Sequence, residues 1–170
     1  MALAARSACG SVATVDLKWP NDLVAPDGRK VGGLLVETSV DGERLSAAVV
    51  GIGLNVNWRT AHMPAELAAT ASSLSDLAGT EQDRSLLLRR LLEELERELA
   101  LVEGGEAPLQ RYRAACRTLG SAVEVESGGR ILRGFAADLD TSGALVILTD
   151  DGPVAVASGE VVRARPAVTA

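Results

Sequence analysis

Two long apolar stretches, residues 30–40 and 44–57, flank Asp41-Gly42 and place the tightest limit on what this chain can fold into. Both are rich in β-branched residues, and Asp-Gly is a strong signal for a two-residue turn between paired strands. A long antiparallel hairpin is therefore predicted. Its strands are nearly continuous in apolar residues, which is typical of a sheet that is covered on its faces.

The middle of the chain is predicted to be helical. A helix begins near Asp83, which can cap its first turn, and it ends at Gly104-Gly105. Apolar residues recur at steps of three and four, which predicts an amphipathic helix, and Glu93 and Arg97 can form an ion pair on its outer face. The recurring residues are Leu88, Leu91, Leu92, Leu95, Leu99 and Val102.

Shorter helices are predicted before and after this one. Residues 2–9 are rich in alanine, and residues 107–118 are compatible with a helix. Ser72-Ser73 can cap a single helical turn, which Gly79 closes.

After Gly120 the pattern changes to short strands separated by glycine-containing turns, which suggests a small barrel. We predict an α+β fold: a partial mixed or antiparallel sheet with packed helices over residues 1–118, then a small β-barrel over 119–170. The five expected barrel strands are residues 122–126, 130–139, 144–149, 153–157 and 160–164.

Composition excludes several classes of protein. Apolar residues make up 47% of the chain, so a core can form, while 17 basic and 23 acidic residues give a net charge of -6. That acidity argues against nucleic-acid binding, and 2% aromatic residues are too few for base stacking. Cys9 and Cys116 are far apart, so neither a disulfide framework nor a zinc site is expected. No apolar run could span a bilayer, and we expect a cytoplasmic protein.

Lys18 is the first candidate for chemistry. It lies near the end of a predicted strand over residues 14–19, and the following segment, 20–28, carries Pro, Asn, Asp and Gly in an order that favours a turn. A lysine at the end of a buried strand can project its charge into a cleft and hold an anion. Alternatively, Lys18 is a solvated lysine at a strand end.

Arg29 and Lys30 form a second candidate, together with Gly32 and Gly33. The glycines allow close approach of a ligand to the backbone, and the basic pair can meet phosphates. No helix follows to supply a positive N-terminus, so the phosphate-loop signal is weak. The alternative is an ordinary loop that leads into a strand.

Asn55 and Asn57 form a third candidate, on one face at the end of a strand. Their amides could bind the edge of a purine or could cap loop backbone. His62 is the only histidine, and we expect it in a surface loop because no nucleophile motif surrounds it. No metal-ligand cluster is present in the sequence, so any metal would be Mg²⁺ that arrives with a nucleotide.

Three motifs, by their order and spacing along the chain, resemble those of biotin–protein ligases. They are LKWPND at 17–22, GRKVGGLLVE at 28–37 and VVGIGLNVN at 49–57. The later run VEVESGGRILRGFAADLDTSGALVIL, followed by SGEVV, is similar to the small C-terminal SH3-like barrel of that family. The resemblance implies a class II synthetase-like ligase catalytic domain followed by an SH3-like β-barrel domain.

The resemblance also implies a reaction. Biotin–[acetyl-CoA-carboxylase] ligases form biotinyl-5′-AMP from biotin and ATP with Mg²⁺, and then transfer biotin to a lysine of a carboxyl-carrier acceptor domain. By similarity Lys18 is the cation that holds both the biotin carboxylate and the α-phosphate of ATP. Arg29, Lys30 and the Gly32-Gly33 backbone line the same cleft. Asn55 is the candidate for the adenine edge. Transfer needs no covalent enzyme intermediate, in agreement with the missing nucleophile.

One departure from the family pattern is large. The family carries a Gly-Arg-rich loop and a biotin-contacting stretch upstream of the KWPND motif, whereas only 17 residues precede Lys18 here and contain neither. We therefore expect an N-terminally truncated ligase without a winged helix, inactive alone, with a bare sheet edge and face that favour self-association. The alternatives are a non-catalytic remnant or one half of a split enzyme that binds a protein through the barrel. A homodimer through the hairpin is also open.

Overall fold

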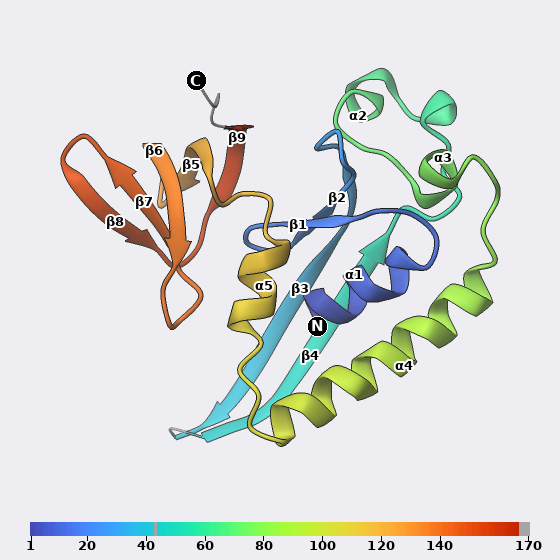
Figure 1. The fold of residues 1–170 in the computed structure, drawn as a ribbon, viewed down its shortest axis with the longest axis horizontal. Coiled ribbons are helices and arrows are strands. Elements are labelled where there is room, and N and C mark those ends of the chain that lie inside the picture. The colour runs from blue at the N-terminus through green and yellow to red at the C-terminus, as the bar shows by residue number, and fades with distance from the viewer. Residues whose placement is uncertain (43, 167–170) are drawn as a thin grey trace. The chain divides into compact units, whose positions relative to one another are not determined.

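The computed structural model describes residues 1–42 and 44–166. The chain divides into two compact units, and each is described by itself (Figure 1). The first unit comprises Met1–Asp16 and Asn21–Glu106, and the second comprises Leu17–Pro20 and Ala107–Ala170. The short strand β1 (Asp16–Lys18) therefore runs from one unit into the other.

The predicted hairpin is present in the first unit. Strands β3 (Lys30–Asp41) and β4 (Arg44–Leu54) pair antiparallel, and Asp41 pairs with Arg44. The turn therefore begins at Gly42, whose φ of 62° lies in the left-handed region that glycine adopts without strain. The second strand is shorter than the predicted run to residue 57, because pairing with β3 ends at Leu54.

The turn predicted over residues 20–28 is wrong in part, because it contains strand β2 (Asp22–Val24). This strand pairs antiparallel with the start of β3. Leu23 and Val24 are buried, and their burial outweighs the turn preference of the surrounding residues. The actual turn is short: the N–H of Ala25 donates to the carbonyl of Arg29 at 2.8 Å.

Beyond its pairing with β2, the rest of β3 pairs with β4 as a two-stranded ribbon (Figure 1). Several apolar side chains of this ribbon are exposed: Leu35 by 62%, Val40 by 68% and Val49 by 67%. The sequence pattern of these strands is typical of a sheet that is covered on its faces. The described residues of the first unit nevertheless leave these side chains uncovered.

Helices occupy the remainder of the first unit. Helix α1 (Ala2–Gly10) packs against α4 (Arg84–Glu103). Between the hairpin and α4 lie a 3₁₀ turn, η1 (Thr60–His62), and the short helices α2 (Ala65–Ala68) and α3 (Leu74–Ala78).

The predicted helix caps are confirmed. The Asp83 carboxylate accepts hydrogen bonds from the backbone N–H groups of Ser85 and Leu86, at 2.8 and 3.0 Å, at the start of α4. The Ser73 hydroxyl caps α3, and Gly79 ends that helix with a left-handed φ of 73°.

The packed face of α4 differs from the predicted apolar stripe. Leu87 and Leu91 are buried, while most of the stripe is exposed. The predicted Glu93–Arg97 pair is wrong: the Glu93 carboxylate lies 3.8 Å from Nε of Arg89, and Arg97 pairs with Glu94 instead. The position of a residue of α4 relative to α1, and not its spacing in the sequence alone, therefore determines whether it is covered.

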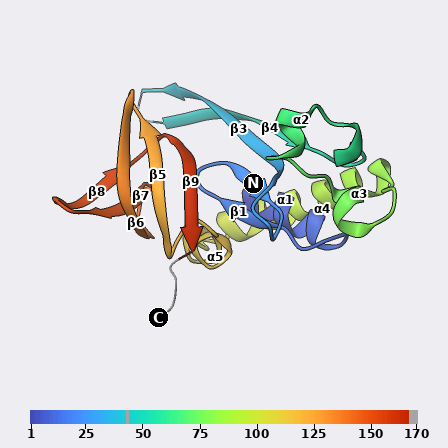
Figure 2. The same ribbon diagram turned by 90° about the horizontal axis from the view of Figure 1, so that it is seen from above.

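The second unit contains the five predicted barrel strands. They form one antiparallel sheet of order β8-β7-β6-β5-β9, in which β9, the last in the chain, pairs with β5, the first of the five (Figure 2). Helix α5 (Leu109–Ala115) precedes the sheet and belongs to the same unit, so the predicted domain boundary at residues 118/119 stays a prediction. The strands are β5 (Ser121–Ser127), β6 (Arg130–Leu139), β7 (Leu145–Thr149), β8 (Gly152–Val156) and β9 (Glu160–Pro166).

Trp19 joins the core of this second unit. Its side chain is buried among strand residues that include Val125, Leu145 and Ile147. Its indole N–H donates to the carbonyl of Gly143 at 3.1 Å. A residue from near the start of the chain therefore contributes to the core of the second unit.

The neighbours of Trp19 are also tied to this unit. The backbone N–H of Trp19 donates to the Thr118 hydroxyl at 3.0 Å, and the N–H of Arg117 donates to the carbonyl of Leu17 at 2.8 Å. The Tyr112 hydroxyl donates to the carbonyl of Pro20 at 2.9 Å. Residues 17–20 therefore belong to the second unit by hydrogen bonds as well as by packing.

Candidate functional site

The predicted site residues divide between the two units. Lys18 belongs to the second unit, beside the buried Trp19. The other five belong to the first unit: Arg29, Lys30, Gly32, Gly33 and Asn55. A site that joins Lys18 to these five stays a prediction.

Lys30 is held by a carboxylate that sequence reasoning missed. Its ammonium lies 2.6 Å from Oδ1 of Asp22, which β2 brings opposite Gly33. A Cβ at Gly33 would lie 3.2 Å from that oxygen and 3.3 Å from the lysine nitrogen. The missing side chain therefore makes room for the ion pair. Asp22 would have been found had residues 22–24 been recognised as a strand.

Gly32 has a different requirement. A Cβ there would lie 2.5 Å from the carbonyl oxygen of Gly53 and 2.7 Å from the Leu54 side chain, closer than real contacts allow. The backbones of β3 and β4 therefore approach at this point in a way that only glycine permits. The glycine pair is explained by strand packing and by the neighbouring ion pair.

Arg29 is fixed by a carboxylate on its own turn. Oδ1 of Asp27 accepts from the backbone N–H of Arg29 at 3.0 Å, and Oδ2 lies 2.8 Å from Nε. The backbone hydrogen bond from Arg29 lowers the pKa of Asp27 below its ordinary value, and the guanidinium adds to this effect. Because this pair is exposed and weak, an anion could compete for the guanidinium.

A second carboxylate lies beyond Arg29. Asp76 accepts from both the backbone N–H of Thr60, at 2.7 Å, and the Thr60 hydroxyl, which in turn is 3.5 Å from Nη1 of Arg29. Partial burial acts to raise the pKa of Asp76, but the hydrogen bonds from Thr60 and Ser73 outweigh it and lower the pKa. The turn of Arg29 is thus linked to η1 and α3.

The two asparagines cap loop backbone. Nδ2 of Asn55 donates to the carbonyl of Ser72 at 3.1 Å. The amide of Asn57 donates to the carbonyl of Gln82 and accepts from its N–H, each at 2.9 Å. Two roles were open for these amides, binding of a purine edge and capping of loop backbone, and the structure shows the capping. Both residues lie just beyond the end of β4.

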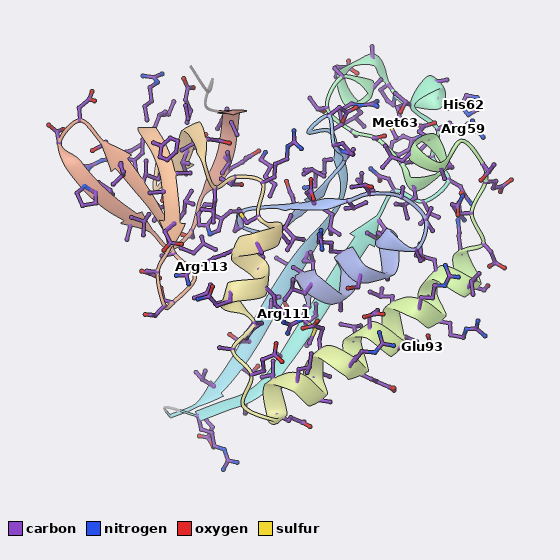
Figure 3. All side chains as sticks on the ribbon, viewed as in Figure 1. Arg59, His62, Met63, Glu93, Arg111 and Arg113 are labelled. Atoms are coloured by element: carbon purple, nitrogen blue, oxygen red, sulfur yellow. The ribbon has the colours of Figure 1, made fainter. Side chains whose placement is uncertain are left out.

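His62 is exposed, as predicted, in η1 beside Arg59 and the buried Met63 (Figure 3). Cys9 and Cys116 are free and buried, and burial raises the pKa of the Cys9 thiol to about 12. Over residues 1–42 and 44–166, no three His, Cys, Asp or Glu side chains gather closely enough to hold a metal.

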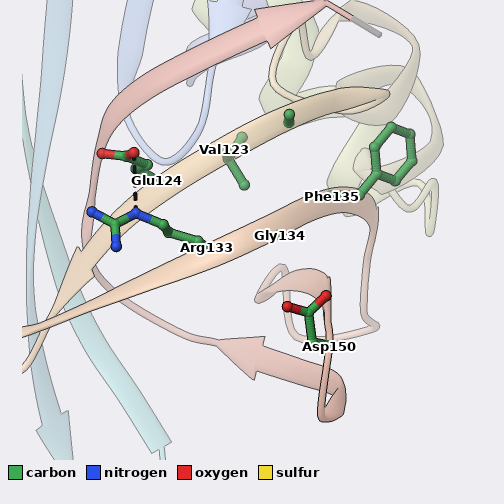
Figure 4. A pocket seen from close by; sticks show the side chains of 7 residues that line it. Val123, Glu124, Arg133, Gly134, Phe135 and Asp150 are labelled. Carbon is green, nitrogen blue, oxygen red and sulfur yellow. Dashed lines mark hydrogen bonds and ion pairs between the residues drawn. The ribbon is translucent and has the colours of Figure 1, made fainter.

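The second unit carries a surface depression of about 440 Å³ over β5 and β6 (Figure 4). Glu124 and Arg133 line it as an ion pair of 3.1 Å, with Phe135 and Asp150 beside them. The sequence did not single out these residues. The phenyl ring is partly exposed, so the depression has both an apolar and a charged part.

Two family models match the chain. The biotin/lipoate A/B protein ligase family matches residues 6–55, and the biotin protein ligase C-terminal domain matches residues 118–163. The chain belongs to the biotin protein ligase family. The first match covers β1 to β4, and the second covers most of the C-terminal sheet.

Individual ligases agree with this assignment. The chain is 37% identical over 155 residues to the biotin–[acetyl-CoA-carboxylase] ligase of Mycobacterium tuberculosis, covering 90% of this chain and 54% of that protein. It is 28% identical over 148 residues to the bifunctional ligase/repressor BirA of Bacillus subtilis, covering 86% and 45%. The chain thus spans about half the length of these curated relatives.

A solved structure shares the fold. The biotin protein ligase of Aquifex aeolicus, in complex with biotin and ATP, superposes with a TM-score of 0.79 at 27% identity. The comparison covers 98% of this chain and 69% of that one. The predicted α+β class is confirmed, with two antiparallel sheets among the described residues. In that part of the chain, no helix is both long and apolar enough to cross a membrane.

Proposed function

We propose that this ligase-family chain acts in ATP-dependent activation of biotin and its transfer to a protein lysine. The observation that carries the proposal is the pair of Lys30 and Asp22 on the glycine-containing start of β3. This pair offers a cation held 2.6 Å from its carboxylate, and Lys30 is still half exposed. An exposed pair of this kind stabilises the fold little, so its ammonium can turn to an arriving anion.

In the proposed first step, a biotin carboxylate oxygen attacks the α-phosphorus of ATP. The new P–O bond gives biotinyl-5′-AMP, and the bond to pyrophosphate breaks. Two anions meet in this step, so fixed cations lower its barrier. Lys18 and Lys30 are the only two lysines of the chain, and both fall in the matched motifs. We assign them to this task, with Arg29 as a further anion contact.

In the proposed second step, an acceptor lysine amine attacks the acyl carbon and AMP leaves with the phosphate oxygen. The acceptor would be a carboxyl-carrier domain of acetyl-CoA carboxylase, the enzyme that the name of the Mycobacterium relative gives. Asn55 remains our candidate for contact with adenine, through the part of its amide that does not bind Ser72. Mg²⁺ would be held mainly by the nucleotide phosphates, with at most one or two carboxylates, because Mg²⁺ keeps its waters readily. We also propose a cytoplasmic location.

A second function is favoured by one observation. The depression beside Phe135 and the Glu124–Arg133 pair is a surface on which the second unit could bind a protein without nucleotide. This would suit the remnant or split-enzyme alternatives. Binding of a carboxyl-carrier domain that persists without ATP and is lost in Phe135→Ala would favour that function over the ligase.

The ligase proposal is tested by measuring biotinyl-5′-AMP formation from labelled ATP. The assay is run with the chain alone and with an added fragment that covers the part of the Mycobacterium tuberculosis ligase outside the matched residues. We expect product only with the fragment, and a loss of about 100-fold or more in Lys30→Ala or Lys18→Ala. Arg44→Ala, at the exposed start of β4, is the control. Product at the full rate in both lysine variants would contradict the assignment.

A further inference from the structure

Lys18 lies on a short segment that the second unit holds on both sides of the lysine. The carbonyl of Leu17, the residue before it, accepts from the backbone N–H of Arg117 at 2.8 Å. The backbone N–H of Trp19, the residue after it, donates to the Thr118 hydroxyl at 3.0 Å. The two peptide groups that flank the lysine are therefore hydrogen-bonded to two consecutive residues, Arg117 and Thr118.

Burial of the neighbouring side chains fixes the face on which Lys18 lies. Leu17 is fully buried and Trp19 is only 3% exposed. Because successive side chains of a strand point to opposite faces, Lys18 lies on the face of β1 away from Leu17, and it is only partly buried there. The hydrogen bonds of the backbone then set the point from which the ammonium of Lys18 extends.

Of these two hydrogen bonds, only the one from Trp19 depends on a side chain. Thr118 is 1% exposed, and its bond to the Trp19 N–H is buried. A buried N–H that loses its acceptor is costly, so the backbone at Trp19 would have to move toward a new partner if the hydroxyl were absent. The identity of residue 118 therefore decides how firmly the segment with Lys18 is held.

We propose that Thr118 is a positioning residue for Lys18: its hydroxyl holds the backbone after the lysine, so that the ammonium is in place when the anions arrive. This inference rests on the proposed ligase function, in which Lys18 is one of the cations. A fixed charge lowers a barrier when it already lies where negative charge develops. A displacement of about 1 Å can lower a rate about 100-fold, so Thr118 affects the reaction without touching a substrate.

Amide hydrogen exchange on the full chain tests the hold itself and needs no ligase activity. The chain has two tryptophans, so labelling them with ¹⁵N gives backbone signals from Trp19 and Trp58 alone. Thr118→Val keeps the shape of the side chain and removes the hydroxyl, so the Trp19 amide should exchange about tenfold faster relative to Trp58. Thr118→Ser keeps the hydroxyl and should exchange like the parent chain. An unchanged Trp19 rate in Thr118→Val overturns the proposal.

Formation of biotinyl-5′-AMP with the added ligase fragment tests what the hold does for the reaction. We expect Thr118→Val to lower turnover per folded molecule about tenfold or more, and Thr118→Ser to stay near the parent chain. In a Lys18→Ala background, Thr118→Val should cause no further loss, because it acts through the lysine. The control is Thr149→Val, which removes a hydroxyl that donates to the carbonyl of Gly152 at 2.8 Å in the same unit.

The two measurements separate this proposal from the ligase function. A parent chain that forms no product with the fragment refutes the ligase function, while the exchange rates still decide whether Thr118 holds the segment. Where the parent chain does form product, full turnover in Thr118→Val overturns the proposal. So does an equal loss from Thr118→Val with and without Lys18, or a loss in Thr118→Ser alone, because Thr118 then serves only the packing or stability of its unit.

Discussion

The two compact units treat their antiparallel strands differently. In the second unit, five short strands curve around a shared core that buries Val125, Leu145 and Ile147 completely or nearly so. In the first unit, the ribbon of β3 and β4 is longer and leaves Leu35 and Val49 mostly exposed. Strongly curved short strands can enclose their own core, whereas a two-stranded ribbon has no third layer to close it.

The difference shows that apolar content is a poor guide to where stability resides. Both units have strands rich in valine, leucine and isoleucine. Only side chains that leave water on folding contribute hydrophobic stabilisation, and the ribbon keeps several of them in contact with solvent. Four substitutions test this contrast.

The largest effect is expected in the core of the second unit. Leu145 is fully buried, so Leu145→Ala should lower the free energy of unfolding by about 3 kcal/mol, through lost transfer energy and a cavity. Leu148→Ala, on the same strand but 47% exposed, is the matched control. Denaturant unfolding can be followed through the buried Trp19 in a Trp58→Phe background. Equal losses in both variants would mean that the sheet does not enclose a core.

A somewhat smaller effect is expected where β3 and β4 approach. Gly32→Ala should cost about 2 kcal/mol, because its Cβ would lie 2.5 Å from the Gly53 carbonyl oxygen and the strands must separate. Gly51→Ala adds the same atom with its nearest contact at 3.9 Å and should cost far less. The fluorescence of Trp58, which lies in the first unit, reports the unfolding. A tolerated Gly32→Ala would contradict the close approach.

A pH-dependent effect of about 1 kcal/mol is expected at Asp76, from the hydrogen bonds that its carboxylate accepts. Its pKa is lower in the folded than in the unfolded chain. The stabilisation is therefore fully present above the unfolded value of about 3.9 and is lost as pH falls through the folded value. Asp76→Asn should be less stable than the parent at pH 7, and the gap should close in acid. The exposed Glu81→Gln is the control, and a gap independent of pH would refute this cause.

The smallest effect on stability is expected on the ribbon. Leu35→Ser should change the free energy of unfolding by no more than about 0.5 kcal/mol, because Leu35 is 62% exposed. It should instead raise the solubility limit by removing an apolar contact point between chains. Leu34→Ser, one residue away and nearly buried, should destabilise clearly. A large loss in Leu35→Ser would show that the ribbon is covered in solution.

Much of the local structure could be predicted because its signals are local. Asp83, Ser73 and Gly79 mark helix ends through bonds that span a few residues, and the turn at Gly42 needs only its own backbone conformation. The five strands of the second unit follow from alternation and turn residues alone. Strand β2 was missed because two apolar residues within a turn-rich segment form a weak local signal.

The site was predicted less completely, because its contacts join separate segments. Lys30 was singled out as a candidate, and that assignment stays a prediction; its ion-pair partner Asp22 depends on the register of β2 against β3. Asn55 was found at a strand end, yet only the fold shows that its amide caps the carbonyl of Ser72.

The sequence by itself determined the hairpin, the helix caps, the barrel strands and the ligase family, since these depend on residue order and on motifs. Only the tertiary structure decided which face of α4 is covered. It also decided that Trp19 belongs to the core of the second unit, where its backbone N–H donates to the Thr118 hydroxyl across 99 positions. Contacts of this kind depend on how segments that are distant in the sequence pack together. A local sequence pattern allows a residue several possible partners, and packing selects one of them.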